Sequence, residues 1–164
     1  MHEESIAIVV ASRHHGNTRK VAEAIARAVG ADLFDAEVVA PGDLADYSMI
    51  GLGSGIYFGA PHRSVRDLAK HLPAAANAAT NKRAFLFSTS GLPFLGWLWH
   101  RGLRRTLSKK GYAIVGEFNC RGWDTVGPLG LIGGLNREHP NDDDLDRARA
   151  FGHSLRRADA STEF

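Results

Sequence analysis

The 164-residue chain has almost no cysteine, no long apolar run and no large excess of charge of either sign. Its one cysteine, Cys120, can form no disulfide within the chain and cannot build a thiolate cluster, which excludes zinc-ribbon and iron–sulfur centres. The apolar runs 6–11 and 127–134 are far shorter than the roughly 20 residues of a membrane-spanning helix. The acidic start, residues 1–4, does not match a secretory signal, so we expect a cytoplasmic protein without a membrane segment.

The net charge and the absence of known motifs argue against several further functional classes. The net charge of +2 is too small to argue for nucleic-acid binding. The chain contains no G-x-G-x-x-G after its first predicted strand, no G-x-x-x-x-G-K-[ST] and no G-x-S-x-G, which argues against NAD, ATP and esterase chemistry. Hydrophobic residues are 44% and charged residues 23%, as in ordinary soluble domains, so we expect one folded domain over residues 1–164.

Strand-like and helix-like segments alternate along the chain. Residues 5–11 form a near-continuous β-branched run, typical of a strand covered on both faces, and residues 18–29 carry apolar side chains at helical spacing. The same patterns predict strands at 32–40, 47–53, 84–88 and 112–119, and helices at 64–72, 95–110 and 144–158. This alternation predicts an α/β, doubly wound three-layer sandwich with a five-stranded parallel sheet. Ligands of such sheets bind beyond the carboxyl ends of the strands.

The loop after the first predicted strand has the composition of an anion site. It reads SRHHGNT over residues 12–18 and leads directly into a helix, whose first N–H groups have no internal partner and favour negative charge. Gly16 allows a phosphate to approach the backbone. The alternative is that Asn17 or Thr18 merely caps the helix. A metal at His14 and His15 is disfavoured because no carboxylate or cysteine completes a ligand set.

Two later loops suit a flat aromatic ligand. Residues 53–59, GSGIYFG, place Tyr57 and Phe58 between glycines, where ordinary turn chemistry would select polar residues. Either ring could stack on a planar ligand, and inward packing in the core is the alternative. Residues 88–94, STSGLPF, offer hydroxyl and amide groups that could read the edge of a ring.

Together the three loops resemble the flavodoxin-like family, whose members hold FMN with a Gly-Asn-Thr phosphate loop and two loops beside the flavin ring. The resemblance runs from residue 5 to about residue 155 and includes the stretch CRGWDTVGP at 120–128. It implies strand order 2-1-3-4-5, FMN as cofactor, and Tyr57 as the main ring contact. The cofactor-binding residues that it implies are Ser12, His14, His15, Gly16, Asn17, Thr18, Ser54, Gly55, Ile56, Tyr57, Phe58, Gly59, Thr89, Ser90, Gly91, Cys120 and Gly122. From the residues themselves, a buried inert thiol is the first interpretation of Cys120.

Two departures from the family pattern concern charge. His15 stands where many flavodoxins carry threonine, which places the chain in a subgroup with histidine before the Gly-Asn-Thr loop and predicts a cationic phosphate pocket. Residues 68–116 contain eight Lys or Arg and no Asp or Glu, whereas flavodoxins are usually acidic around the flavin. Four of these cations share one face of the predicted helix: Arg101, Arg104, Arg105 and Lys109. The face is either simply solvated or a docking surface for an acidic partner.

The leading functional expectation is an FMN-binding flavodoxin that transfers electrons between redox partner proteins, more a carrier than a stand-alone enzyme. No catalytic residue and no metal are then required. The alternative is a two-electron FMN-dependent oxidoreductase of the same fold, resembling a quinone or protoporphyrinogen reductase, with residues 122–136 as a substrate wall. A non-redox module that acts through the basic helix is the third possibility.

Overall fold

A parallel sheet forms the centre of the computed structural model, which describes residues 4–13, 16–75, 81–122, 131 and 137–160. Five strands run parallel in the order β2-β1-β3-β5-β6, which confirms the predicted fold class and strand order. These strands are β1 (Ile6–Ala11), β2 (Asp32–Asp35), β3 (Met49–Tyr57), β5 (Arg83–Ser90) and β6 (Ala113–Arg121). A further short strand, β4 (Ala60–Pro61), pairs antiparallel with the end of β3 and was not predicted.

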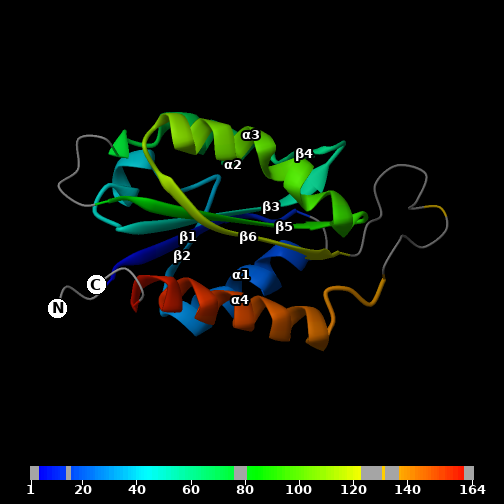
Figure 1. The fold of residues 1–164 in the computed structure, drawn as a ribbon. Coiled ribbons are helices and arrows are strands. Elements are labelled where there is room, and N and C mark those ends of the chain that lie inside the picture. The colour runs from blue at the N-terminus through cyan, green and yellow to red at the C-terminus, as the bar shows by residue number, and fades with distance from the viewer. Residues whose placement is uncertain (1–3, 14–15, 76–80, 123–130, 132–136, 161–164) are drawn as a thin grey trace.

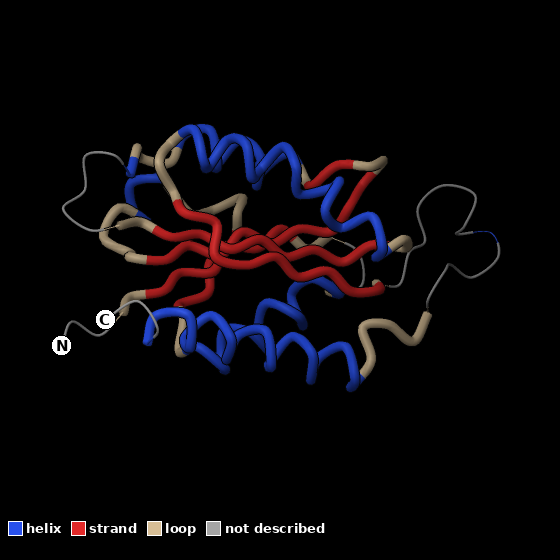
Figure 2. The backbone as a smooth tube through the Cα atoms, in the orientation of Figure 1, coloured by secondary structure: helices blue, strands red, loops and turns tan. Residues whose placement is uncertain are grey.

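Helices cover both faces of the sheet (Figure 1). The helices α1 (Asn17–Val29) and α4 (Asp142–Ala160) lie on one face, and α2 (Arg63–His71) and α3 (Gly96–Lys109) lie on the other. The buried side chains form two separate clusters, one on each face, and the three layers are visible in Figure 2. No helix in the described ranges is long and apolar enough to cross a membrane.

Two predicted element boundaries are wrong for local reasons. The second strand ends at Asp35 and not at residue 40, because the Asp35 side chain accepts a hydrogen bond from Glu37 N (2.8 Å) and starts a turn that leads to a 3-10 helix, η1 (Pro41–Leu44). The third strand continues past Gly53 to Tyr57, so residues 53–57 of the predicted loop 53–59 are strand. The Asp35 side chain thus ends the second strand, and antiparallel pairing with β4 extends the third.

Close packing at the centre of the sheet depends on two glycines of β3. Gly51 and Gly53 lie opposite Phe85 and Phe87 of β5 in the strand register. A Cβ atom added to Gly51 would lie 2.2 Å from the Phe85 ring, and one added to Gly53 would lie 2.0 Å from the Phe87 ring. Each phenyl ring therefore covers a glycine on the neighbouring strand, beneath α1 and α4.

We expect Gly53→Ala to destabilise the protein because its methyl group must displace the buried Phe87 ring. Overpacking of this kind costs about 1–3 kcal/mol, measured as a lower free energy of unfolding in urea. Gly102→Ala in α3 is the matched control, because no atom lies within 4 Å of its added Cβ. It should stabilise the helix by roughly 0.5–1 kcal/mol. Equal effects of the two changes would contradict this account of the sheet centre.

Candidate flavin site

Three segments that lie far apart in the sequence meet at the carboxyl edge of the sheet. The Thr18 hydroxyl at the start of α1 lies 2.8 Å from the Thr89 hydroxyl near the end of β5, and both residues are buried. Gly122, just after β6, fits against both segments, since an added Cβ would lie 3.0 Å from Thr89 Cβ and 3.2 Å from Asn17 Nδ2. The predicted cofactor residues Asn17, Thr18, Thr89 and Gly122 are thus brought together.

The start of α1 has the geometry of an anion site. Gly16 occupies the N-cap position with φ of 67° and, as a glycine, has no side chain that could cap the helix. Neither Asn17 nor Thr18 is the cap, because both already belong to the helix, so the capping alternative is wrong. Apart from its chain neighbours, no described residue has an atom within 4 Å of a Cβ added to Gly16. Ser12 Oγ accepts a hydrogen bond from Arg19 N at 3.3 Å. His14 and His15 lie outside the described residues.

The segment with adjacent aromatics forms a hairpin between β3 and β4. Phe58 and Gly59 both have positive φ, 49° and 80°, as a two-residue type I′ turn requires. A bulky side chain is rare in that conformation, and such strain is typical of functional sites. The Phe58 side chain is 94% exposed, so it does not pack inward, and the core alternative is wrong for this residue.

Tyr57 connects the hairpin to the anion loop. Its hydroxyl accepts a hydrogen bond from Arg13 N at 3.3 Å, and its side chain lies back over Gly55, whose added Cβ would lie 2.8 Å from that hydroxyl. Ser54 is buried and its hydroxyl holds the hairpin by accepting from His62 N and donating to Gly55 O, both at 2.6 Å. The two predicted ligand-binding loops are therefore in direct contact through one side chain.

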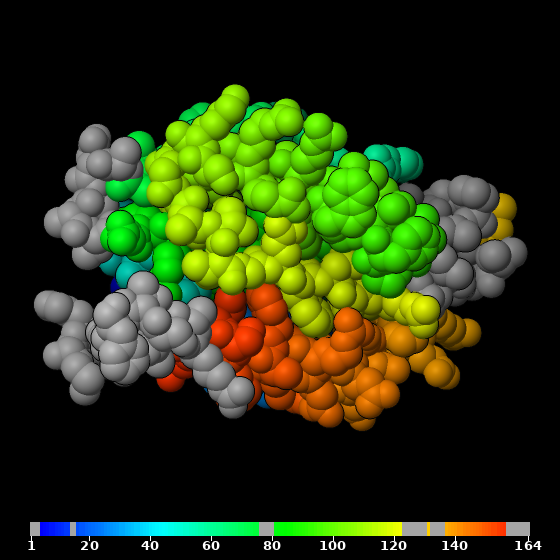
Figure 3. Space-filling model, viewed as in Figure 1, coloured from blue at the N-terminus to red at the C-terminus, as the bar shows by residue number. Residues whose placement is uncertain are grey.

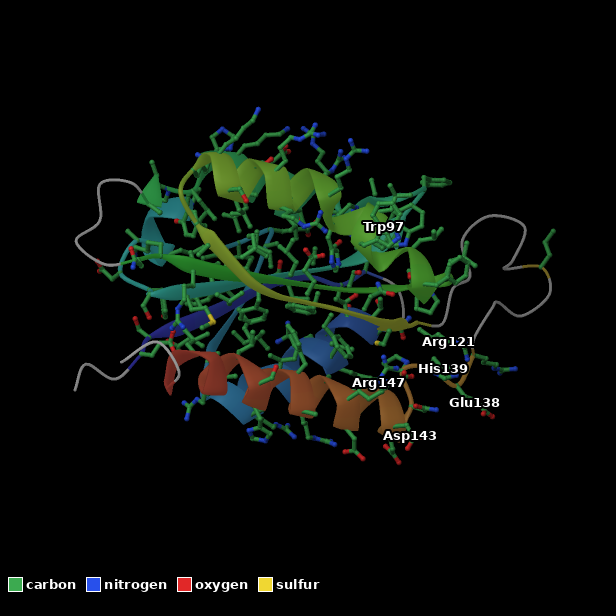
Figure 4. All side chains as sticks on the ribbon, in the orientation of Figure 1. Trp97, Arg121, Glu138, His139, Asp143 and Arg147 are labelled. Atoms are coloured by element: carbon green, nitrogen blue, oxygen red, sulfur yellow. The ribbon has the colours of Figure 1, made fainter. Side chains whose placement is uncertain are left out.

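Exposed apolar side chains gather at the same end of the molecule. Besides Phe58, Phe94 is 72% exposed and Trp97 63% exposed, and these two lie at the start of α3. The hairpin is adjacent, because a Cβ added to Gly59 would lie 3.3 Å from the Trp99 ring. In Figure 3 bulky green side chains of this region project from the surface, and Figure 4 shows Trp97 and Arg121 at the end where the strands finish. Exposed aromatic clusters mark binding surfaces.

A buried polar network lies between β5, β6 and α3. His100 Nε2 lies 2.7 Å from Ser88 Oγ, and His100 Nδ1 lies 3.0 Å from Glu117 Oε2. The Arg104 guanidinium donates to both Glu117 oxygens, at 2.5 and 2.9 Å. Burial lowers the pKa of His100 and outweighs the hydrogen bond to Glu117, which raises it. Burial alone would raise the pKa of Glu117, but hydrogen bonds from Arg104 and His100 outweigh it and lower that pKa.

This network corrects the predicted basic face. Arg104 points toward β6, and its half-buried charge is paired with Glu117 of that strand. Arg101, Arg105 and Lys109 are exposed, and no described acidic side chain pairs with them. The predicted cationic face therefore consists of three residues and not four. Sequence reasoning missed His100 and Glu117 because their partners belong to other elements.

Comparison with known proteins agrees with this geometry. A family model described as a flavodoxin domain matches residues 7–93. An uncharacterized protein of Methanocaldococcus jannaschii is 44% identical over 148 residues, which cover 90% of this chain and 95% of that protein. The chain belongs to the flavodoxin domain family.

Solved flavodoxins share the fold of this family member. A flavodoxin from the domain Archaea has a TM-score of 0.65 at 18% identity. The match covers 93% of this chain and 97% of that flavodoxin. Oxidised flavodoxin 2 from Bacillus cereus has a TM-score of 0.70 at 17% identity. The match covers 94% of this chain and 99% of that flavodoxin. The rubredoxin oxygen:oxidoreductase of Desulfovibrio gigas contains the same fold within 38% of its chain, with a TM-score of 0.70 at 14% identity and 99% of this chain covered.

The cofactor of the flavodoxin family is FMN, and the described residues fit it. Backbone N–H groups at a helix start with glycine at the N-cap suit a phosphate, and the contacts among Thr18, Thr89 and Gly122 bring three of the predicted cofactor-binding segments together beside it. Ile56 pairs with Pro61 at the base of the hairpin. In the segment after β5, the backbone oxygen of Ser90 accepts a hydrogen bond from Gly122 N at 3.2 Å. No group of three metal-ligating side chains occurs among the described residues.

Cys120 of this flavodoxin is buried beside the site and held as a neutral thiol. It lies opposite Thr89 in the register of β5 and β6, and its side chain is only 1% exposed. Burial and, to a smaller extent, the carboxylate of Asp144 raise the pKa of Cys120 to about 12, against an opposing effect of Arg147. Asp144 is fixed in place by Asn141, whose side chain caps the start of α4. Most of the segment that follows, residues 123–130 and 132–136, lies outside the described residues.

We expect the Cys120 thiol to be inert in the folded protein. At pH 8 a thiol with a pKa near 12 is ionised to about one part in ten thousand, against roughly a quarter for an unperturbed cysteine. Labelling by a thiol-specific disulfide reagent should be at least about a thousandfold slower in the native protein than in denaturant. Stoichiometric labelling of the native protein within seconds would contradict the burial of this side chain.

Proposed function

We propose that this flavodoxin is an electron carrier that holds FMN at the carboxyl edge of its sheet and passes electrons between redox partner proteins. The observation that carries the proposal is the convergence of three segments at Thr18, Thr89 and Gly122, next to a helix start with glycine at its N-cap. A site of this kind provides binding and electrostatics, and it needs no nucleophile, acid or base from the protein.

Different segments would bind the phosphate and the flavin ring of FMN. Backbone N–H groups at Gly16 and the first turn of α1 would bind the phosphate, together with Ser12 and with His14 and His15 as cations. The segment Thr89–Gly91 would meet the edge of the flavin ring, and Tyr57 and Phe58 would contact its faces. FMN, when bound, supplies the acceptance and release of electrons. The protein orients it and limits its contact with water.

The exposed surface around the site supports a carrier. Phe58, Phe94 and Trp97 form an apolar rim at the end of the molecule where the flavin ring would be accessible. Arg101 and Arg105 follow along the exposed face of α3, so the surface next to the rim is positive. An apolar centre beside a charged border is the usual composition of a transient protein interface, and this one would select an acidic partner.

A two-electron oxidoreductase of the same fold is the competing function, and direct reduction by NADH or NADPH separates the two. A carrier should accept electrons from NAD(P)H only through a reductase protein. Rapid anaerobic bleaching of the FMN-loaded protein by NADPH alone would favour the enzyme.

We expect Gly16→Ala to weaken FMN binding by at least about tenfold, because its methyl group occupies the space over the helix start and the left-handed conformation is strained by roughly 1–2 kcal/mol. Gly30→Ala is a matched control, since Gly30 has φ of 69° at the opposite end of the same helix. Gly30→Ala should lose at least as much stability, since its added Cβ also lies 3.2 Å from Arg156 Nη2, but it should bind FMN as the wild type does. The measurement is quenching of FMN fluorescence. Equal affinities for the two variants would place the phosphate elsewhere.

We expect the cationic face to govern reaction with charged oxidants. Combined Arg101→Glu and Arg105→Glu should slow oxidation of the reduced FMN-loaded protein by ferricyanide roughly tenfold at low ionic strength. The difference should vanish near 1 M salt, where the Debye length is about 3 Å. Arg27→Glu with Arg149→Glu, on α1 and α4, makes the same charge change on the opposite face of the sheet. An equal loss of rate in this control would mean that net charge alone matters.

A further inference from the structure

A directed chain of hydrogen bonds connects the end of β5 to the outer edge of the sheet. It begins at Ser90, whose hydroxyl donates to Asn119 Oδ1 at 3.4 Å. The Asn119 amide donates to Ser88 Oγ and to Ser88 O, the latter at 3.2 Å. Ser88 Oγ lies 2.7 Å from His100 Nε2, and His100 then reaches Glu117. Ser88 and Ser90 flank Thr89, which belongs to the proposed flavin site.

The neutral form of His100 gives the Ser88 hydroxyl proton an acceptor within this chain. Glu117 is ionised, because it accepts two bonds from Arg104, so His100 Nδ1 carries the proton and donates to Glu117. His100 Nε2 then has a lone pair and accepts from the Ser88 hydroxyl. Ser88 Oγ in turn accepts from Asn119, so each polar atom has one defined role.

Protonation of His100 would reverse its bond to Ser88. A second proton on Nε2 makes both ring nitrogens donors, and the Ser88 hydroxyl must turn its own proton away to another acceptor. Ser88 is only 1% exposed, so its turned hydroxyl has no bulk water to accept the proton. A buried hydroxyl proton without an acceptor is unfavourable, so a charged His100 disfavours the present arrangement at the end of β5.

Protons reach this network through a cleft of about 240 Å³ between α3 and β6. His100, Glu117 and Asn119 line it together with Phe94 and Trp97. The charged groups that face His100 are Glu117 from β6 and Arg104 from its own helix. β5 presents only the Ser88 hydroxyl, and no charged side chain from the described parts of α2, β4 or η3 (Pro93–Leu95) bonds to the ring.

We propose that His100 is a positioning residue for the flavin: in its neutral form it holds Ser88 and Asn119, and through them the Thr89–Gly91 segment, in the arrangement that receives FMN. Charging of His100 releases this segment and weakens FMN binding. The inference rests on the proposed flavin site and adds a proton-sensitive control to it. By thermodynamic reciprocity, FMN binding must then make His100 harder to protonate by the same factor.

The test compares FMN dissociation constants of the wild type and His100→Gln between pH 7.5 and pH 4.5. The FMN phosphate titrates near pH 6, and the comparison at each pH cancels its effect. Between these limits the dissociation constant of the wild type should rise at least about fivefold more than that of His100→Gln. Ser88→Ala, which breaks the link and leaves His100 in place, should follow His100→Gln. His153→Gln, an exposed change on α4, should follow the wild type.

A second measurement requires no variant. Nitrogen NMR of the His100 imidazole in the wild-type protein should give a lower pKa with FMN than without it, by the logarithm of the factor found in the binding experiment. Parallel binding curves for the wild type and His100→Gln, or an unchanged His100 pKa, would overturn the proposal and leave the flavin site standing. Failure of the wild type to bind FMN at pH 7.5 would overturn both.

Discussion

Parallel pairing of β3 with β5 is the constraint on which the site depends. Two phenyl rings of β5 lie over two glycines of β3, and this contact fixes the register in which Ser54 lies beside Ser88. Pairing of β5 with β6 then places Thr89 opposite Cys120. Every segment that contributes to the flavin site leaves the sheet at one edge because all five long strands point the same way. A shift of one residue in either register would separate the hydroxyls and backbone groups that now meet there.

Much of this arrangement could be predicted from the sequence because it depends on local patterns. Continuous β-branched runs identified the buried strands, and helical spacing identified the covering helices. The anion loop was expected from a glycine followed by Asn17 and Thr18 at a helix start, a weak signal by itself that gained weight from the two other loops. Gly122 could be assigned only through family resemblance, since its value lies in a close contact with Thr89 across the sheet edge.

The features that could not be predicted depend on contacts between elements. The hairpin of Phe58 and Gly59 was expected as a loop, because nothing in the local sequence announces a two-residue strand that pairs back onto β3. Arg104 was assigned to the exposed cationic face, since its spacing from Arg101 and Arg105 fits one face of a helix. Its partner, Glu117, lies on another element. The role of His100 was hidden for the same reason. Charge and hydrogen bonding across the sheet edge, and not helical spacing, decide what these side chains do.

The central claim is that this edge of the sheet holds FMN and passes on its electrons one at a time. An anaerobic reductive titration of the FMN-loaded protein, followed by visible spectroscopy and potentiometry, tests it most directly. The account predicts one FMN per chain and two resolved one-electron steps. A single two-electron step at one potential would contradict the carrier and favour the two-electron oxidoreductase.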